Sequence, residues 1–471
     1  MSKPIEIRNP RTGKYDYVII PPPEKLLVQQ CNRLRRAQKK WFDLGLDGRI
    51  DALLQWKDAI YTTRDELTEA LVIDTGRLSL SKSEIDSLVS SIDRWCRLAS
   101  RFLQDTEKGT SIPFINLQQT ALPYPLVGVI SPWNFPLLLS TIDTIPALLA
   151  GCAVIVKPSE ITPRFMAPLM NAVNAVPTLR DILTFIEGDG KTGATLVENV
   201  DLVCFTGSVE TGQQVAIAAA QRFIPAFLEL GGKDPGIVLE SANIELATSA
   251  ILWGSVVNSG QSCLSIERIY VAKNILEDFY HKLVTKAHKL KLAYPTLESG
   301  EIGPIISEKQ VAIINEHLQD AVEKGAVIHS GGEVEKIGGG WWCHPTVMTE
   351  VNHDMKIMNE ETFGPIMPIM SFSTVEEAIE LANDTFYGLS AAIFSESRDE
   401  ALQIARQIDA GAISINDASL TAMMQEAETN AFKFSGLGAS RMGASALTRF
   451  MRKKAFLIKT NDNYDSWWFN Q

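Results

Sequence analysis

The chain has 471 residues, of which 45% are hydrophobic and 21% charged, and its formal net charge is −12. This apolar content excludes disorder for the bulk of the chain, and the length fits about two to four domains of roughly 150 residues each. The excess of carboxylates over basic residues argues against a nucleic-acid partner, which would require a basic face.

The N-terminus predicts a protein without a targeting segment, because charged and turn residues stand where a signal peptide has an apolar run. The most apolar stretch, residues 137–156, is interrupted by Asp143, Pro146 and Gly151. We therefore expect a buried helix that leads into a buried strand there, and no membrane span. The six cysteines are scattered without a Cys-x-x-Cys pair, which is typical of reduced thiols and predicts a cytoplasmic protein.

In chain order, residues 24–104 show apolar positions at three-to-four spacing, which predicts amphipathic helices. Residues 105–125 combine glycine and prolines with alternating polarity, which predicts an extended or hairpin segment. From residue 126 onward, short β-rich runs alternate with helical patterns, which indicates βαβ units around a parallel sheet. These runs lie at 126–131, 153–157, 182–188 and 202–208.

A second alternating series begins after Gly231 and Gly232, where we place the boundary between two α/β domains. The glycines at 331–332 and 338–340 are predicted to form turns between strands and not phosphate-binding loops. Strands are predicted at 266–273, 326–331, 344–348, 367–372, 390–395 and 411–416, with a helix over 373–385.

Two residues are the first candidates for chemistry. Cys263 is bordered by small polar residues after an apolar helical run, which indicates an accessible thiol, although a buried or incidental thiol also fits the pattern. Glu229 ends an apolar stretch before two glycines, where desolvation would raise the carboxyl pKa and suit a general base. A plain carboxylate at the end of a helix or strand is the alternative for Glu229. A histidine base for Cys263 is possible in principle, but the six histidines stand in no distinguishing motif.

Polar turns follow several of the predicted strands. Two prolines hold Asn134 in the motif SPWNFP, which suits a side-chain amide that donates to an oxyanion. The motif KPSE at 157–160 follows a strand, and FTGS at 205–208 precedes a helix whose N–H groups could bind a phosphate. The motif NEETFGP at 359–365 joins paired carboxylates to an aromatic residue and a turn.

The sequence GKT at 190–192 imitates the end of a P-loop, which would indicate an NTPase. The first glycine of that motif would fall at position 185, which is Phe185. The P-loop therefore fails, and an NTPase is excluded.

Taken together, these motifs resemble the aldehyde dehydrogenase superfamily and its shorter, often dimeric branch. PWNFP, KPSE, FTGS, LELGGK, GQSC, ETFGP and SGLG occur in the order of that superfamily, from about residue 120 to 440. The resemblance implies an α/β, aldehyde dehydrogenase-like fold with two Rossmann-like domains and a small extended oligomerisation segment. The NAD-binding domain would comprise 1–104 and 126–231, and the catalytic domain 232–420. Residues 105–125 and about 440–471 would form the oligomerisation hairpin and the C-terminal tail.

The resemblance also implies catalytic roles and an activity. Cys263 would attack the aldehyde carbon, Asn134 and the backbone N–H of Cys263 would stabilise the oxyanion, and Glu229 would activate the water that releases the acid. The implied activity is NAD(P)-dependent oxidation of a small-molecule aldehyde to a carboxylic acid, through a thiohemiacetal and a thioester. No metal site is expected. The implied cofactor-binding residues are Ser131, Pro132, Trp133, Lys157, Ser159, Glu160, Gly207, Ser208, Gly212, Leu230, Glu361 and Phe363.

The cofactor is expected to be NAD, with NADP as the alternative. Lys157 and Glu160 match positions that bind the adenosine ribose, and a carboxylate there would repel the extra phosphate of NADP. The stretch TNAFKFSG at 429–436 departs from the PFGG-like sequence common in the superfamily. Because that region lies near the substrate mouth in relatives, the resemblance does not identify the aldehyde.

The Pro-bearing segment 105–125 and the aromatic tail, with Trp467, Trp468 and Phe469, predict a homodimer, with a tetramer as the alternative. Two other functions remain open at this point: a CoA-acylating aldehyde dehydrogenase and a non-enzymatic relative of the same fold. A retained base at Glu229 argues against the first, because it implies hydrolysis. The presence of both Cys263 and Glu229 argues against the second.

Overall fold

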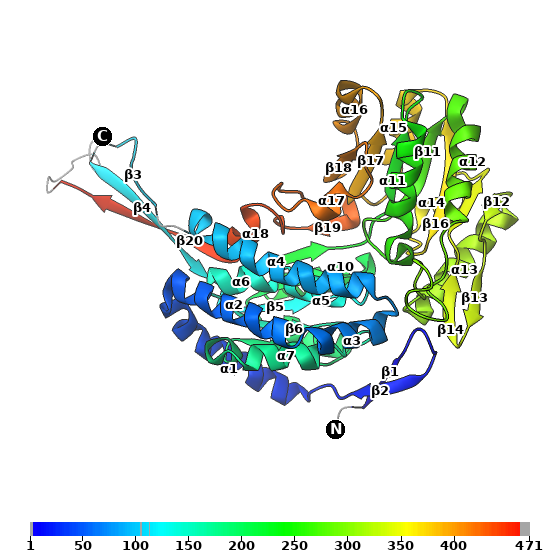
Figure 1. Cartoon of the computed structure of the whole chain (residues 1–471). Coiled ribbons are helices and arrows are strands. Elements are labelled where there is room, and N and C mark those ends of the chain that lie inside the picture. Colours follow the sequence, from blue (N-terminus) through cyan, green and yellow to red (C-terminus); the bar gives the residue numbers. More distant parts are fainter. Residues whose placement is uncertain (1–2, 104–105, 113, 462–471) are drawn as a thin grey trace.

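The computed structural model describes residues 3–103, 106–112 and 114–461 (Figure 1). A hairpin of β1 (Ile5–Arg8) and β2 (Tyr15–Ile19) precedes four helices. These are α1 (Glu24–Asp43), α2 (Gly45–Thr62), α3 (Arg64–Thr75) and α4 (Ser79–Phe102), so the expected helical region is confirmed. Their apolar faces contribute to one large core together with the first sheet.

The first sheet has the strand order β19-β9-β8-β5-β6-β7. β9, β8, β5, β6 and β7 are parallel, as the alternating pattern predicts, and β19 pairs antiparallel with β9. The strands are β5 (Leu126–Ile130), β6 (Ala153–Lys157), β7 (Leu183–Phe185), β8 (Leu202–Thr206), β9 (Ala226–Glu229) and β19 (Gly436–Leu437). The helices between them are α5 (Pro136–Thr141), α6 (Thr144–Ala150), α7 (Met166–Asn174), α8 (Pro177–Arg180), α9 (Gly190–Val197) and α10 (Val209–Gln221).

The order of this sheet creates a crevice beside β5. The chain runs outward from β5 through β6 to β7 and then returns to the other side of β5 as β8. Ligands of open parallel sheets bind at such a reversal, outside the carboxyl ends of the strands. The turns that follow β5, β6 and β8 carry the polar motifs identified in the sequence, so the topology gathers them at one edge.

The second sheet has the order β12-β15-β16-β11-β10-β17-β18, and only β12 runs antiparallel to its neighbour within it. Its strands are β10 (Asp234–Val238), β11 (Ile266–Ala272), β12 (Val327–Ser330), β15 (Thr346–Thr349), β16 (Ile366–Phe372), β17 (Ser390–Phe394) and β18 (Ala412–Ile415). A separate hairpin comprises β13 (Val334–Ile337) and β14 (Gly340–Cys343). Both predicted glycine turns lie next to this hairpin.

Helices flank the second sheet (Figure 1). They are α11 (Ile244–Val256), α12 (Leu276–Ala287), α13 (Glu308–Glu323), α14 (Lys356–Asn359), α15 (Val375–Asn383), α16 (Arg398–Ala405) and α17 (Leu420–Met423), with short 3-10 turns at η1 (Val257–Gly260), η2 (Lys273–Ile275) and η3 (Lys433–Ser435). The chain crosses from the first sheet to the second between Glu229 and Asp234, around the predicted boundary.

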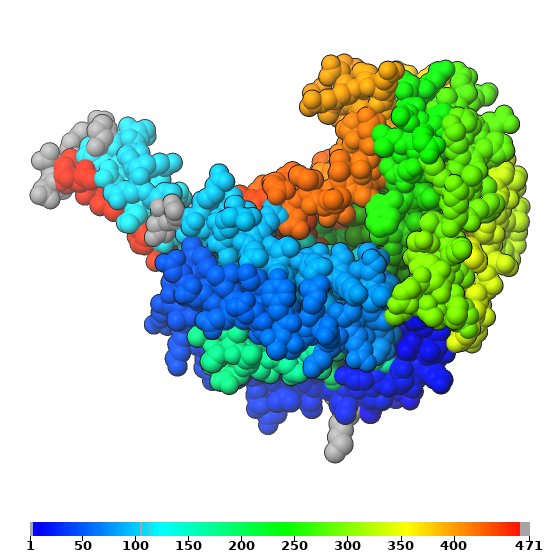
Figure 2. Space-filling view, viewed as in Figure 1, coloured from blue at the N-terminus to red at the C-terminus, as the bar shows by residue number. Residues whose placement is uncertain are grey.

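A third sheet of β3 (Thr106–Gly109), β4 (Ile115–Pro123) and β20 (Met451–Lys459) forms an arm. The extended conformation expected for this region is present, and the arm projects away from the body of the molecule (Figures 1 and 2). The aromatic residues Trp467, Trp468 and Phe469 lie outside the described residues.

Two segments make contacts across the expected division of the chain. The β1–β2 hairpin, assigned with the first domain, reaches the second half of the chain, because Arg11 Nη1 donates to the Ala293 carbonyl at 2.7 Å. At the other end, α18 (Ser445–Thr448) falls in the expected tail but packs in the core of the first sheet through Ala446 and Leu447, and Phe450, which follows the helix, is buried in the same core. Both segments contact distant parts of the sequence, which local patterns do not reveal.

The apolar stretch 137–156 folds into most of α5, α6 and the start of β6, and most of its side chains are buried. Among the described residues, no helix combines the length and apolarity needed to cross a bilayer.

Candidate active site

The loop that carries Cys263 has an unusual backbone. Asn258, Ser259 and Gly260 all have positive φ, at 55°, 56° and 71°. A side chain at Gly260 would place its Cβ 2.1 Å from the Gly364 carbonyl oxygen, so only glycine fits. Strained backbone of this kind persists where surrounding contacts enforce it, and it is concentrated at functional sites.

Gln261 supplies several of the enforcing contacts. Its buried side chain donates to the Asn258 carbonyl oxygen at 2.9 Å and accepts from the Ile306 N–H at 2.9 Å. Ser259 Oγ donates to the Gly303 carbonyl oxygen at 2.9 Å. The loop is therefore fixed to the 303–306 segment, and Cys263 is presented at a defined place.

Asn134 is held beside this loop. Its Nδ2 donates to the Gln261 carbonyl oxygen at 3.0 Å, while Asn258 Nδ2 donates to the Asn134 carbonyl oxygen at 3.0 Å. A primary amide has two N–H donors, so a second donor remains for another acceptor. The Asn134 Oδ1 atom is buried without a hydrogen-bond partner.

The turn before α5 is anchored from α4. The Glu84 carboxylate accepts from the backbone N–H groups of Leu137 and Leu138, both at 3.0 Å, and is paired with Arg77 at 2.7 Å. The Arg77 guanidinium also lies over the Phe135 ring, 4.5 Å from its centroid. These contacts fix the segment that follows Asn134.

A cavity of about 120 Å³ lies at the crevice beside β5, where the two halves of the chain meet. Cys263 and Asn134 both line it, together with predicted cofactor residues from the ends of β5 and β8 and from the 361–363 segment. The Trp133 and Phe363 rings pack edge to face, 5.6 Å apart. The lining consists of Pro132, Trp133, Asn134, Leu139, Thr206, Gly207, Ser208, Leu230, Gly231, Cys263, Gln310, Glu361 and Phe363.

Some predicted cofactor residues lie outside this lining. Lys157 Nζ and Glu160 Oε2 form an ion pair at 3.2 Å just beyond β6, and Ser159 Oγ accepts from the Ile161 N–H at 3.2 Å. Ser131 is buried, and its hydroxyl is bonded to Ser140 Oγ at 2.6 Å, so it is directed into the fold.

The residues present fit a dinucleotide along this edge. α10 begins directly after β8, with Ser208 as its N-cap, so its N-terminal N–H groups suit a diphosphate. The Lys157–Glu160 pair lies at the end of β6, two strands away from β8 in the sheet. It offers a donor and an acceptor for ribose hydroxyls. Gly212, on the first turns of α10, allows Leu230 to pack closely, since a Cβ there would lie 2.4 Å from Leu230 Cδ2.

Sequence reasoning missed the groups that hold the 361–363 segment. The Glu267 carboxylate accepts from the Thr362 and Phe363 N–H groups at 2.7 and 2.8 Å and is paired with Lys233 at 2.6 Å. Gln310 Nε2 donates to the Thr362 carbonyl oxygen at 2.6 Å. Lys233 could have been identified from the sequence because it lies in the motif LELGGK. Its partner Glu267 stands in no motif.

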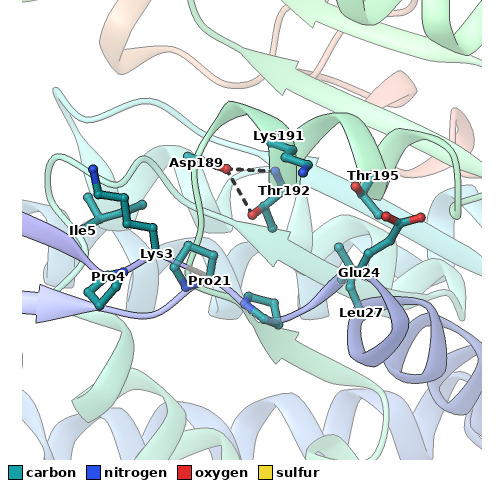
Figure 3. A pocket seen from close by; sticks show the side chains of 11 residues that line it. Lys3, Pro4, Ile5, Pro21, Glu24, Leu27, Asp189, Lys191, Thr192 and Thr195 are labelled. Atoms are coloured by element: carbon teal, nitrogen blue, oxygen red, sulfur yellow. Dashed lines mark hydrogen bonds between the residues drawn. The ribbon is translucent and has the colours of Figure 1, made fainter. Parts of the chain in front are cut away.

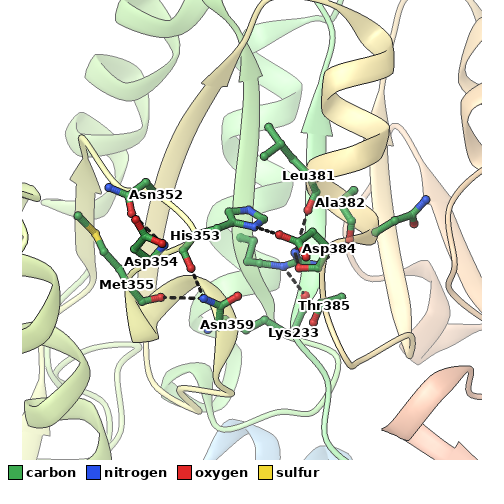
Figure 4. Close-up of polar contacts among 12 residues, drawn as sticks. Lys233, Asn352, His353, Asp354, Met355, Asn359, Leu381, Ala382, Asp384 and Thr385 are labelled. Carbon is green, nitrogen blue, oxygen red and sulfur yellow. Dashed lines mark hydrogen bonds and ion pairs between the residues drawn. The ribbon is translucent and has the colours of Figure 1, made fainter.

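The segment before Glu361 is anchored by a second polar cluster (Figure 4). Asn359 Nδ2 donates to the His353 carbonyl oxygen, and His353 Nδ1 is bonded to Asp384 at 2.7 Å. His353 Nε2 and the Tyr270 hydroxyl are 2.9 Å apart. The cluster connects the approach to Glu361 with β11 and the end of α15.

Burial dominates the electrostatics of the cavity. It raises the pKa of Cys263 to about 12, and the nearby Glu361 and Asp234 carboxylates act in the same direction. Burial also raises the pKa of Glu361 to about 8, although its Oε1 accepts from the Gly232 N–H at 3.0 Å. The Cys263 thiol is therefore protonated near neutral pH in the absence of ligand.

Glu229 lies at the end of β9, next to the cavity-lining Leu230. Burial raises its pKa, while Arg441 and Arg449 oppose that rise. Arg441 Nε lies 3.7 Å from Glu229 Oε1. Arg441 was not identified from the sequence, because it follows the SGLG motif in a stretch without a recognisable pattern.

A cavity of about 590 Å³ lies elsewhere, between the N-terminal segment and α9 (Figure 3). It contains the P-loop imitation. The Asp189 carboxylate accepts from Thr192 N and Thr192 Oγ1 at 3.1 and 3.3 Å, and so occupies the end of α9 where a phosphate would bind. This geometry agrees with the failure of the P-loop motif.

All six cysteines are free. Across the described ranges, no three histidine, cysteine, aspartate or glutamate side chains are grouped as a metal site would require.

The sequence pattern of the aldehyde dehydrogenase family matches residues 2–456. The chain is 36% identical to the 4,4'-diapolycopene aldehyde oxidase of a Methylomonas species, over 90% of this chain and 80% of that protein. It is 34% identical to a Mycolicibacterium smegmatis protein named as an NADP+ succinate-semialdehyde dehydrogenase, over 92% of this chain and 84% of that protein.

Solved structures give the same result. A protein of Anabaena variabilis, described as the aldehyde dehydrogenase PutA, superposes with a TM-score of 0.98 and 71% identity, over 99% of this chain and 100% of that one. The betaine aldehyde dehydrogenase of Staphylococcus aureus, in complex with NAD+, superposes with a TM-score of 0.91 and 30% identity. The superposition covers 99% of this chain and 94% of that one.

The chain belongs to the aldehyde dehydrogenase family. This confirms the resemblance, the α/β fold class and the predicted class of activity, an oxidoreductase that oxidises aldehydes to acids with NAD(P).

Proposed function

We propose that Cys263 is the nucleophile of this oxidation. The observation that supports it most strongly is that Cys263 and Asn134 share one cavity at the reversal of a parallel sheet. Cys263 Sγ would attack the aldehyde carbon and form a thiohemiacetal. The second Asn134 N–H and the backbone N–H of Cys263 would stabilise the negative charge that develops on the aldehyde oxygen.

The thiol must lose its proton before it attacks, because burial keeps Cys263 protonated. Solvent takes up this proton, and Glu229 is the base that we assign to the later hydrolysis, since burial raises its pKa towards the working range. In the hydrolytic step, Glu229 removes a proton from water, the water oxygen adds to the thioester carbonyl, and the carbon–sulfur bond breaks to release the acid.

NAD is the cofactor that we propose, and when bound it accepts the hydride lost by the thiohemiacetal. The α10 N-terminus with Ser208 would hold the diphosphate, and Lys157 with Glu160 the adenosine ribose. Glu361, Phe363 and Trp133 would lie near the nicotinamide end, because they line the same cavity as Cys263. Glu160 favours NAD over NADP by charge repulsion.

We propose a homodimer. The arm strand β20 is the outer strand of its sheet, and Leu457 on it is 74% exposed. β18 is the outer strand of the second sheet, and the helix that follows it carries Met423, 73% exposed. Open strand edges with exposed apolar side chains favour association. Six free cysteines agree with a reducing compartment, which supports the cytoplasm.

The test is NADH formation, followed by its absorbance, with a panel of small aldehydes. We expect Cys263→Ala to abolish turnover and to leave cofactor binding largely intact. Turnover at the wild-type rate in that variant would contradict the proposed nucleophile.

A further inference from the structure

The C-terminal part of the chain returns to the strand that ends in Glu229. Gly436 of β19 pairs with Glu229 in antiparallel register, and the Leu230 N–H donates to the Ser435 carbonyl oxygen at 2.8 Å. Arg441 follows a few residues later. The pairing of β19 with β9 therefore brings a basic residue, far away in the sequence, to the proposed general base.

Arg441 is buried and held by several acceptors. Its Nη2 donates to Thr206 Oγ1 at 2.7 Å and to Asp143 Oδ2 at 3.2 Å, while its Nε lies 3.7 Å from Glu229 Oε1. That Nε atom is buried and forms no hydrogen bond. The guanidinium is thus fixed on one side by Thr206 and Asp143 and presents Nε to the Glu229 carboxylate.

A second arginine, Arg449, allows the contact of Arg441 with Glu229 to be separated from its contact with Asp143. Arg449 Nη2 is paired with the Asp143 carboxylate on its other oxygen, and Asp143 is buried. Arg441 and Arg449 therefore share Asp143 as a partner, but the ion pair with Glu229 is made by Arg441. Loss of either arginine leaves Asp143 with one cation.

We propose that Arg441 is a positioning residue for the hydrolytic step, which orients the Glu229 carboxylate through its Nε while Thr206 and Asp143 fix the guanidinium. This inference rests on the proposed function, in which Glu229 is the base. It adds a role for a residue outside the recognised motifs.

The charge of Arg441 has a predictable sign. The charged groups that face Glu229 are Arg441, Arg449 and Asp143, and the Cys263 thiol lies within electrostatic range. Arg441 favours the carboxylate form and so lowers the pKa of Glu229, whereas Asp143 raises it. Loss of Arg441 should therefore lower the ionised fraction of Glu229 at a given pH, and loss of the Asp143 charge should raise that fraction.

The hydrolytic step can be observed without cofactor by means of p-nitrophenyl acetate. The Cys263 thiol loses its proton to solvent and its Sγ attacks the ester carbonyl. The bond to p-nitrophenolate then breaks, and an acetyl thioester remains on the enzyme. Water then adds to the thioester, and acetic acid leaves with the thiol restored. The burst of p-nitrophenolate reports acylation, and the steady phase that follows reports hydrolysis.

We expect Arg441→Met to keep the burst amplitude. The acidic limb of its pH profile, in which the rate of the steady phase is plotted against pH, should move to higher pH by roughly one unit. At a pH below that limb, the steady rate of the variant should be about tenfold lower than that of the wild type. Arg441→Lys, which keeps a charge, should recover most of the rate. Arg449→Met is the matched control, since it removes the other partner of Asp143, and it should move the limb less.

Asp143→Asn should move the acidic limb in the opposite direction, to lower pH, and this variant keeps the inference testable if Arg441→Met fails to fold. An unchanged pH profile in Arg441→Met, or an equal shift in Arg449→Met, would overturn the role of Arg441. A wild-type enzyme without a burst, or with the same ester hydrolysis as Cys263→Ala, would instead overturn the proposed function on which that role rests.

Discussion

The amide nitrogen of Asn134 donates to the carbonyl oxygen of Gln261 at 3.0 Å, two residues before Cys263 in the sequence. This bond joins the turn after β5 in the first sheet to the loop after α11 in the second half of the chain. The proposed nucleophile and the proposed oxyanion donor are therefore positioned by one direct contact.

Asn134→Ala should lower kcat by about 10²- to 10³-fold, the usual cost of one oxyanion donor. The loop should keep its shape, because Asn258 Nδ2 also donates to the Gln261 carbonyl oxygen, at 3.0 Å. Steady-state kinetics, together with thermal unfolding of the same variant, separates a lost donor from a lost fold. A kcat equal to that of the wild type would contradict the assignment of Asn134.

The raised pKa of Cys263, about 12, predicts slow alkylation by iodoacetamide near neutral pH in the cofactor-free enzyme. Because the thiolate is the reactive form, the rate should rise with pH and reach no plateau below about pH 10. Glu361→Gln should increase the rate above about pH 8, where Glu361, whose pKa is about 8, is ionised and disfavours the thiolate. The exposed Glu376→Gln serves as the control. A plateau near neutral pH would contradict the effect of burial on Cys263.

Glu160 is predicted to set the cofactor preference. We expect NAD to exceed NADP by at least roughly tenfold in kcat/KM, which corresponds to about 1.4 kcal/mol. Glu160→Ser should narrow this difference, because it removes the carboxylate that would face the extra phosphate. The measurement is kcat/KM with each cofactor for both proteins, and a wild-type preference for NADP would place Glu160 away from the ribose.

The exposed strands β20 and β18 predict association. Sedimentation at micromolar concentration should give a mass of two chains of 51.9 kDa each. Leu457→Lys, on the outer strand of the arm, should weaken that association by adding charge to an exposed apolar edge. A wild-type monomer would contradict the proposed homodimer.

Much of the fold and several site residues could be predicted from local sequence. The runs that became β5, β6 and β8 alternate with helices, and the turns after them carry Asn134, Glu160 and Ser208 at one sheet edge. Such predictions succeed because strand periodicity and turn chemistry act over a few residues.

Long-range contacts were not predictable in the same way. Arg441 reaches Glu229 only because β19 pairs with β9, and Glu267 reaches Thr362 only because β11 lies beside that segment. The β1–β2 hairpin was missed since its strands are short and its contacts, such as Tyr15 with Glu308, lie far along the chain. No local pattern encodes such pairings.

The central claim, a thioester on Cys263 that Glu229 hydrolyses, is tested most directly by trapping that intermediate. Glu229→Gln is mixed with aldehyde and NAD, quenched, digested and examined by mass spectrometry, with Cys263→Ser and the wild type as controls. We predict that the acyl group accumulates on the peptide that contains Cys263 in Glu229→Gln, after a single burst of NADH. Steady turnover without an acyl group on that peptide, or an acyl group on a different cysteine, would contradict the account.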